Sequence, residues 1–133
     1  MANGTIAFDT LSTSGQITGT AKSVDTDYVV NGSAKSWVNF NGTSTVAIRE
    51  SLNVTNILDE GTGDYTVNFT NSMANANYNN VAGGQQTLGA ANREIKVPGD
   101  TTPTAAALQL WTTSNASLID FNFISVSNFG DLA

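Results

Sequence analysis

The clearest pattern of apolar and polar positions in the chain has a period of two. Along residues 64–70, the apolar residues Tyr65, Val67 and Phe69 alternate strictly with polar neighbours. Such alternation is typical of an antiparallel strand with one buried face and one solvent-facing face. The segment therefore predicts a strand whose three apolar side chains belong to the core.

A second alternating segment, residues 45–54, predicts a neighbouring strand. Glu50 falls on its apolar face, which indicates either a bulge or a carboxylate that pairs with a cation or reaches the sheet edge. Between the two strands, residues 58–64 combine two glycines with three acids and predict a hairpin loop. The apolar face of the second segment consists of Val46, Ile48, Leu52 and Val54.

Two Asn-Gly pairs indicate turns upstream of these strands. Asn31-Gly32 separates residues 27–30 from residues 33–38 and predicts the two-residue type I′ turn of a hairpin. Asn41-Gly42 repeats the signal directly after residues 37–40. This part of the chain is therefore expected to contain strands joined by tight turns.

Two further strands are expected towards the carboxyl end, at residues 106–112 and 118–127. In the second of them, Ile119, Phe121 and Phe123 share one face before the apolar pattern shifts by one position. A bulge would explain this shift.

The remaining segments predict little regular structure. Residues 79–91 are rich in Asn, Gln and Gly and predict a long loop or an irregular edge, and residues 98–103 predict a turn that holds both prolines. Good helix formers other than Ala are scarce, so we expect at most one helical turn, at residues 73–78.

These elements fit an all-β fold, an antiparallel β-sandwich or a jelly-roll-like arrangement of about seven or eight strands. A chain of 133 residues has the size of one domain. We therefore expect a single β domain over residues 1–133, in which residues 1–25, rich in Thr, Ser and Gly, form an extended amino-terminal arm or an edge strand.

Composition excludes several classes of function. Hydrophobic residues make up 40% of the chain, enough for a folded core, whereas charged residues make up only 12%. The chain has no Cys and no His, which excludes disulfides, thiol nucleophiles, Cys/His zinc sites and Ser-His-Asp triads. A net charge of −6 with only five Lys and Arg residues argues against a nucleic-acid partner.

The acidic residues do not form a recognisable site in the sequence. Glycoside cleavage needs two carboxylates at close range, but no pair of acids is marked by its spacing. Residues 25–27 and 59–64 could offer oxygens to Ca²⁺, and residues 59–64 are the better candidate. We therefore expect no enzyme activity, no catalytic residue, no metal site and no cofactor.

Aromatic and apolar residues supply the remaining candidates for binding. Trp37, Trp111 and Tyr78 could stack on sugar rings, although packing within a sheet explains the two tryptophans better. Isolated apolar residues near the two ends are candidate contacts for partner proteins: Ile6, Phe8, Phe129 and Leu132.

Targeting signals are not expected in this sequence. Residues 1–9 have neither a basic start nor a long apolar run, so they do not resemble a signal peptide. No window approaches the roughly 18 continuous apolar residues that span a bilayer. We therefore expect synthesis in a cytoplasm, with no transmembrane segment and no membrane insertion.

Three segments resemble a family of bacteriophage virion proteins. They are residues 33–43 (SAKSWVNFNGT), 46–54 (VAIRESLNV) and 61–70 (GTGDYTVNFT), and the similarity ends near residues 73–78 (MANANY). The pattern is similar to K-x-W-V-N-F-N-G-T, V-x-I-R-x-S-x-N-V and G-T-G-D-Y-T-V-N-F segments in tail-fibre and other structural proteins of marine and cyanobacterial phages. The resemblance covers roughly a third of the chain.

The resemblance implies a β-rich, non-enzymatic virion component that is often trimeric. Two positions on the particle stay open: a tail-fibre or appendage domain for assembly or host contact, and a capsid decoration (cement) protein on the head exterior. A glycan-binding module is a further alternative. The expected location is the virion, and the expected partners are copies of the chain in a homotrimer, other virion proteins and, in the last case, a host-surface glycan.

Overall fold

The computed structural model describes residues 16–18, 23–85 and 92–133, with side chains described from Asp27 onward within these ranges. The chain divides into two compact units, Met1–Ser33 and Ala34–Ala133. The β-sandwich belongs to the second unit.

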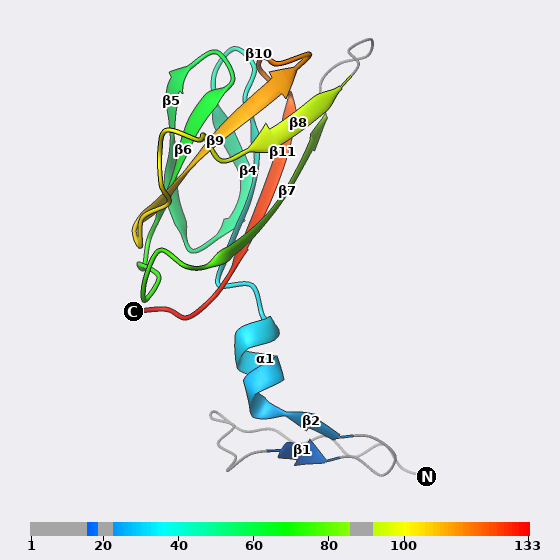
Figure 1. Ribbon diagram of the computed structural model, residues 1–133, viewed down its shortest axis with the longest axis vertical. Coiled ribbons are helices and arrows are strands. Elements are labelled where there is room, and N and C mark those ends of the chain that lie inside the picture. The colour runs from blue at the N-terminus through cyan, green and yellow to red at the C-terminus, as the bar shows by residue number, and fades with distance from the viewer. Residues whose placement is uncertain (1–15, 19–22, 86–91) are drawn as a thin grey trace. The chain divides into compact units, whose positions relative to one another are not determined.

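The described residues of the amino-terminal unit form two short strands and one helix. Strand β1, Gln16–Thr18, pairs antiparallel with β2, Ser23–Asp25, and helix α1, Thr26–Gly32, follows (Figure 1). The arm or edge strand predicted over residues 1–25 is described only at these two strands, which pair with each other. Its other residues lie outside the described ranges.

The hairpin predicted around Asn31-Gly32 is wrong, because residues 27–30 belong to helix α1. Asp27 lies in the first turn, where a carboxylate interacts favourably with the helix dipole. At the other end, the Ser33 hydroxyl donates a hydrogen bond of 2.5 Å to the Val29 carbonyl. Asn-Gly is a signal for helix ends as well as for hairpin turns, and here it ends a helix.

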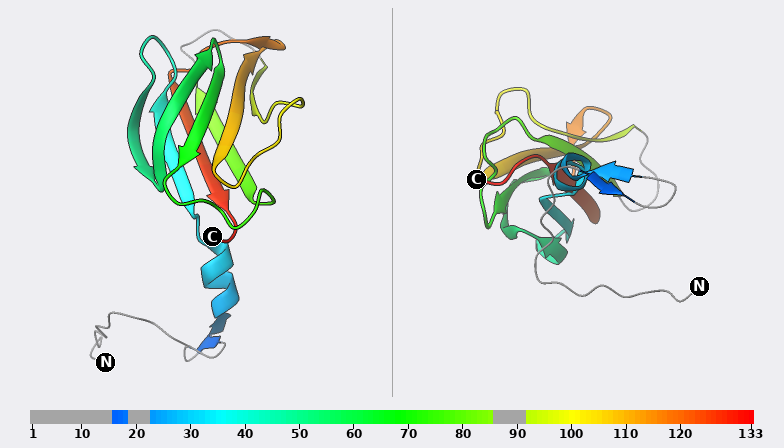
Figure 2. Two further views of the ribbon diagram at one scale, coloured as in Figure 1. Left: turned by 90° about the vertical axis from the view of Figure 1, so that its left-hand side faces the viewer. Right: turned by 90° about the horizontal axis from the view of Figure 1, so that it is seen from below.

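In residues 34–85 and 92–133 the second unit has nine strands, which Figures 1 and 2 show as two sheets packed face to face. The strands are β3 Ser36–Asn41, β4 Ala47–Leu52, β5 Val54–Gly61, β6 Asp64–Phe69, β7 Asn79–Gln85, β8 Arg93–Lys96, β9 Ala107–Ser114, β10 Ser117–Leu118 and β11 Phe123–Phe129. One sheet has the order β4-β3-β11-β7, and in the other β9 pairs with β10, β6 and β8, and β6 pairs with β5. All pairs are antiparallel, which confirms the predicted all-β antiparallel sandwich.

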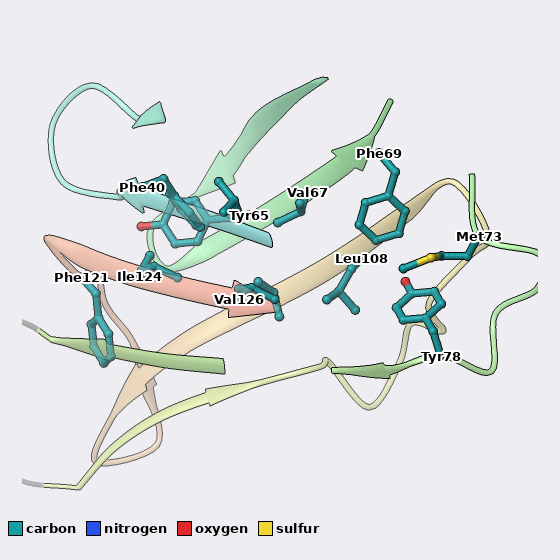
Figure 3. Packing of buried hydrophobic residues seen from close by; sticks show 12 residues of the cluster. Phe40, Tyr65, Val67, Phe69, Met73, Tyr78, Leu108, Phe121, Ile124 and Val126 are labelled. Carbon is teal, nitrogen blue, oxygen red and sulfur yellow. The ribbon is translucent and has the colours of Figure 1, made fainter. Parts of the chain in front are cut away.

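The hydrophobic core lies between the two sheets (Figure 3). On β6, Tyr65, Val67 and Phe69 are buried, as their alternation predicts. The rings form two edge-to-face pairs, Phe40 with Tyr65 at 5.3 Å and Phe69 with Tyr78 at 5.6 Å between centroids. Burial of each large apolar side chain contributes about 1.5–3 kcal/mol, so these rings are a major source of stability.

The predicted hairpin loop within residues 58–64 is present and tighter than expected. Strand β5 continues to Gly61, and Thr62 and Gly63 form the turn into β6. Gly63 has φ 66°, and a Cβ atom there would lie 2.6 Å from the Thr112 carbonyl oxygen. Both facts require glycine at this position.

The segment 45–54 is only partly as predicted. The bulge is present, because Asn39 pairs with Glu50 while Phe40 pairs with Ile48, which leaves Arg49 as the extra residue. The predicted burial is wrong for two positions of the apolar face. Ile48 is 37% exposed because β4 is an edge strand, and Leu52 is 49% exposed because it pairs with Trp37 on the outer face of the sheet.

The predicted strand over residues 45–54 is also divided in two. Asn53 adopts a left-handed conformation with φ 56°, which ends β4 at Leu52. Val54 then begins β5 in the other sheet.

Residues 79–85 correct another prediction, since they form strand β7 instead of a loop or irregular edge. The strand pairs with β11 along its whole length, from Asn79 opposite Phe129 to Gln85 opposite Phe123. Asn and Gly weaken the sequence signal for a strand, and only the ladder with β11 supplies the pairing. Residues 86–91 lie outside the described ranges.

Two predictions near the ends of the sandwich are also wrong. The strand expected over residues 118–127 is interrupted, because β10 ends at Leu118 and β11 begins at Phe123. Phe121 is buried between them whereas Phe123 is 44% exposed. The helical turn expected at residues 73–78 is absent, and Met73 instead forms an isolated bridge with Leu132.

Candidate functional site: an interaction face on the four-stranded sheet

An apolar row crosses the outer face of the four-stranded sheet. Trp37 on β3 lies opposite Leu52 on β4 and opposite Ser127 on β11, and Ser127 lies opposite Val81 on β7. Leu52 is 49% and Val81 58% exposed, while Trp37 is half-buried. This row, with Phe129 and Phe123 described next, is the interaction face.

Two further aromatic residues extend the interaction face along β11. Phe129 lies two residues beyond Ser127, which makes it the diagonal cross-strand neighbour of Trp37. Phe123 lies at the other end of the strand, with the Arg49 guanidinium 5.6 Å from its ring centroid. Trp37 and Phe129, predicted from sequence for different partners, thus share one face.

Short polar side chains fill the middle of this face. The Asn39 amide donates hydrogen bonds to the Ser125 hydroxyl at 2.8 Å and to the Ile124 carbonyl at 3.3 Å. Arg49 donates to the carbonyls of Phe40 at 3.0 Å and Asn122 at 2.5 Å, so its charge is held close to the backbone. These hydrogen bonds within the chain hold the two side chains in place before any other protein binds.

Charge is scarce on this sheet. Of its four strands only β4 carries charged residues, Arg49 and Glu50. Burial of a charge without a partner is costly, so a face whose charged residues are confined to its edge strand β4 loses little on contact with a neutral surface. Chemically, the interaction face suits a protein surface or a neutral sugar.

The three residues predicted to stack on glycans do not form one site. Trp111 lies on the other sheet, in register with Asp64 on β6 and Lys96 on β8. Tyr78 is 8% exposed, and its hydroxyl donates to the Ala107 carbonyl at 3.1 Å. Burial raises the pKa of Tyr78 to about 12. Of the three, Trp37 alone belongs to the interaction face.

Phe129 and Leu132, the two residues near the carboxyl end that are predicted to contact partners, are each partly exposed. Phe129 is half-buried on the interaction face. The side chain of Leu132 is 43% exposed, while its backbone pairs with Met73 and the Ala74 N–H donates to the Asp131 carbonyl at 2.8 Å. Ile6 and Phe8 lie outside the described residues.

Sequence reasoning missed the role of Asp120. Its Oδ1 atom accepts a hydrogen bond from the Gly63 N–H at 2.7 Å and lies 2.9 Å from the Tyr65 hydroxyl, which is also 2.9 Å from the Gly42 carbonyl. Burial and then the Asp120 carboxylate raise the pKa of Tyr65 above its ordinary value, so the phenol stays protonated. The hydrogen bonds of Tyr65 and Asp120 connect the loops that contain Gly42, Gly63 and Asp120. No local sequence motif indicates this cluster.

Two acids of residues 59–64, the better candidate segment for Ca²⁺, accept hydrogen bonds within the protein. Asp59 accepts from the Gly61 N–H at 3.2 Å, and Asp64 accepts from the Gln109 amide at 2.8 Å. Among the described residues, no three acids are grouped around a possible metal position, and the surface has no pocket.

Helix α1 is too short to cross a membrane, and the described ranges contain no helix that could.

Comparison with known proteins adds no relative: no family model, no curated protein and no solved structure matches the chain. The assignment of the interaction face therefore rests on the residues of this chain alone.

Proposed function

We propose that this protein is a non-enzymatic structural component of a bacteriophage virion, a tail-fibre or appendage-type β domain that mediates assembly or host contact. One observation carries the proposal. The segment that resembles phage structural proteins, residues 33–78, contains β3 to β6 and therefore supplies strands to both sheets. It includes Trp37 of the interaction face and Tyr65 of the core.

The chemistry of the interaction face supports a role in assembly. Long charged side chains cost up to about 2 kcal/mol each when they are ordered at a contact. Ser125, Ser127 and Asn39 are short, and Asn39 is already held by hydrogen bonds. Other virion proteins can therefore dock on this face at a low entropic cost.

Copies of the chain are the second class of partner. The resemblance to phage structural proteins supplies the threefold symmetry, and we propose a homotrimer on that basis. Sedimentation equilibrium of the purified chain tests it. A species three or six times the chain mass of 13.9 kDa supports the trimer, and one of 13.9 kDa at all concentrations contradicts it.

The position on the particle is open to direct observation. Antibodies raised against the purified chain, coupled to gold, are applied to purified particles and viewed by electron microscopy. Label at the tail or its fibres supports an appendage, and label over the head supports the alternative of a capsid decoration protein. Particles that carry no label, while the infected-cell lysate reacts, contradict both.

A glycan-binding module is the second candidate function. The specific observation is that the Trp37 ring lies beside Ser127, whose hydroxyl faces the same side of the sheet. An aromatic face with adjacent hydroxyl and amide groups suits a neutral sugar ring. Glycan-array binding that Trp37→Ala abolishes and Trp111→Ala, on the other sheet, preserves would support this function.

A further inference from the structure

The edges of the two sheets differ in their protection. Natural edge strands avoid unwanted pairing through charged residues, prolines and bulges. Strand β4 carries Arg49, Glu50 and a bulge, β5 carries Asp59 and Glu60, and β8 carries three charges in four residues. Strand β7, NNVAGGQ, has no charge and no proline, and its ladder with β11 has no register shift.

The direction of the backbone groups on β7 follows from those on β11. The carbonyls of even-numbered residues of β11 face β3. The Ile124 carbonyl accepts a hydrogen bond from the Asn39 amide, and the Asn128 carbonyl accepts one from the Lys35 N–H. Just before the strand, the Asn122 carbonyl faces the same side and accepts from Arg49 on β4. Backbone groups alternate sides along a strand, so odd-numbered residues of β11 face β7.

The register then identifies which groups of β7 remain open. The odd residues of β11 pair with Asn79, Val81, Gly83 and Gln85 of β7. The N–H and C=O groups of Asn80, Ala82 and Gly84 therefore point away from β11, towards the open edge of the sheet. Within the described part of the chain, these groups form no hydrogen bond with another element.

We propose that β7 pairs antiparallel with β7 of a second copy of this chain, around a twofold axis at Ala82. In this register Ala82 lies opposite Ala82 of the second copy, and Asn80 lies opposite its Gly84. The open N–H and C=O groups of all three residues in each copy are then hydrogen-bonded. The two four-stranded sheets become one continuous sheet.

The side chains of β7 fit a second copy in this register. Val81, 58% exposed, lies opposite Gly83 of the second copy, which has no side chain and open space around its Cβ position. Asn79 lies opposite Gln85 of the second copy, so an amide meets an amide. Strand β7 itself brings no charge into the contact, although each chain carries a net charge of −6. The strand is thus complementary to itself.

This twofold contact goes beyond the proposed function and does not depend on it. It uses a sheet edge, so it is compatible with a threefold contact through other surfaces. A contact through β7 alone gives a dimer, and in combination with a trimer it gives a hexamer. In either case, loss of the β7 contact halves the mass of the assembly.

The first test introduces like charges at the edge. Val81→Lys combined with Gly83→Lys places ammonium groups directly opposite one another in both copies, which is destabilising for the pair. Sedimentation equilibrium should show half the mass of the unchanged protein, and circular dichroism should show that the separated chain keeps its β structure, because both positions are exposed in the single chain. The matched control, Asn56→Lys with Leu58→Lys on exposed positions of β5, should keep the full mass.

Charge exchange makes this test specific. Mixing the Lys variant with a variant that carries Val81→Glu and Gly83→Glu should restore the full mass, because opposite charges then face each other. An unchanged protein that stays at 13.9 kDa, or a Lys variant that keeps the full mass, overturns the proposal.

The second test fixes the register by cross-linking. The chain has no cysteine, so introduced thiols are the sole reactive ones. Val81 and Gly83 of the second copy form a non-hydrogen-bonded pair with Cα atoms about 4.5 Å apart, within disulfide range. A mixture of Val81→Cys and Gly83→Cys chains should form a disulfide-linked dimer under mild oxidation. Equal cross-linking of Val81→Cys with Leu118→Cys contradicts the register.

Discussion

The hydroxyl oxygen of Tyr65 lies 2.9 Å from Oδ1 of Asp120, a carboxylate 55 residues further along the chain. The same carboxylate oxygen accepts from the Gly63 N–H at 2.7 Å. The hydroxyl also lies 2.9 Å from the Gly42 carbonyl. One buried phenol thus connects the turn before β6, the loop after β3 and the segment before β11.

Removal of this hydroxyl should destabilise the sandwich. We expect Tyr65→Phe to lower the free energy of unfolding by about 1.5–3 kcal/mol, the range for hydrogen bonds to charged groups. Tyr78→Phe is the matched control, because its hydroxyl bonds a neutral carbonyl, and it should cost about 0.5–1.5 kcal/mol. Urea denaturation measures both, and a smaller loss for Tyr65→Phe than for Tyr78→Phe contradicts the role of Asp120.

Alkaline pH should weaken the fold through the buried tyrosines. Burial raises the pKa of Tyr78 from 10 to about 12, and burial together with Asp120 also raises the pKa of Tyr65. The unfolded chain therefore loses these protons first, so the stabilisation is complete below pH 10 and falls as the pH rises through 12. The urea midpoint should decline over this range, and less steeply in Tyr78→Phe. A urea midpoint that stays constant or rises over this pH range would contradict the prediction.

Phe69 should be among the costliest residues to truncate. It is 8% exposed and packs edge-to-face on Tyr78 at 5.6 Å. Phe69→Ala should lower the free energy of unfolding by about 3–5 kcal/mol. Thr70→Ala, at the exposed next position, should change it by less than about 0.5 kcal/mol. A loss below about 1 kcal/mol for Phe69→Ala would mean that the ring is not part of the core.

Gly42 should resist substitution because of its contact with Tyr65. A Cβ atom at Gly42 would lie 2.5 Å from the Tyr65 hydroxyl oxygen and 2.9 Å from the Phe121 carbonyl oxygen. We expect Gly42→Ala to cost about 1–3 kcal/mol through overpacking. Gly99→Ala, with no atom within 4 Å of its Cβ position, is the control and should be nearly neutral. Similar unfolding midpoints for the two variants would show that the loop can move away.

The sequence predicted the centre of the fold better than its edges. Strand β6 is covered on one face by the other sheet, so its alternation matches its burial. Strand β4 alternates as clearly, but Ile48 lies on an edge strand and the bulge at Arg49 leaves Leu52 on the outer face, so both remain exposed. Strand β7 shows no alternation and depends on β11, about 40 residues away, for its pairing. Local patterns carry no information about such long-range pairing.

The same reason limits what could be predicted of the candidate site. Trp37 and Phe129 were each identified as candidates, but their proximity depends on the register between β3 and β11. Asp120 was one of several acids without a distinctive spacing, and the fold alone brings it to Tyr65. Residue type was informative, whereas the grouping of residues required the structure.

The protein content of purified particles tests the central claim most directly. Gradient-purified virions are analysed by quantitative mass spectrometry, with peptides of this chain counted relative to those of the major head protein. The account predicts that the chain co-purifies with infectious particles at a constant ratio to the head protein through successive gradients. A chain that stays in the soluble lysate, or whose ratio falls towards zero with each gradient, would contradict it.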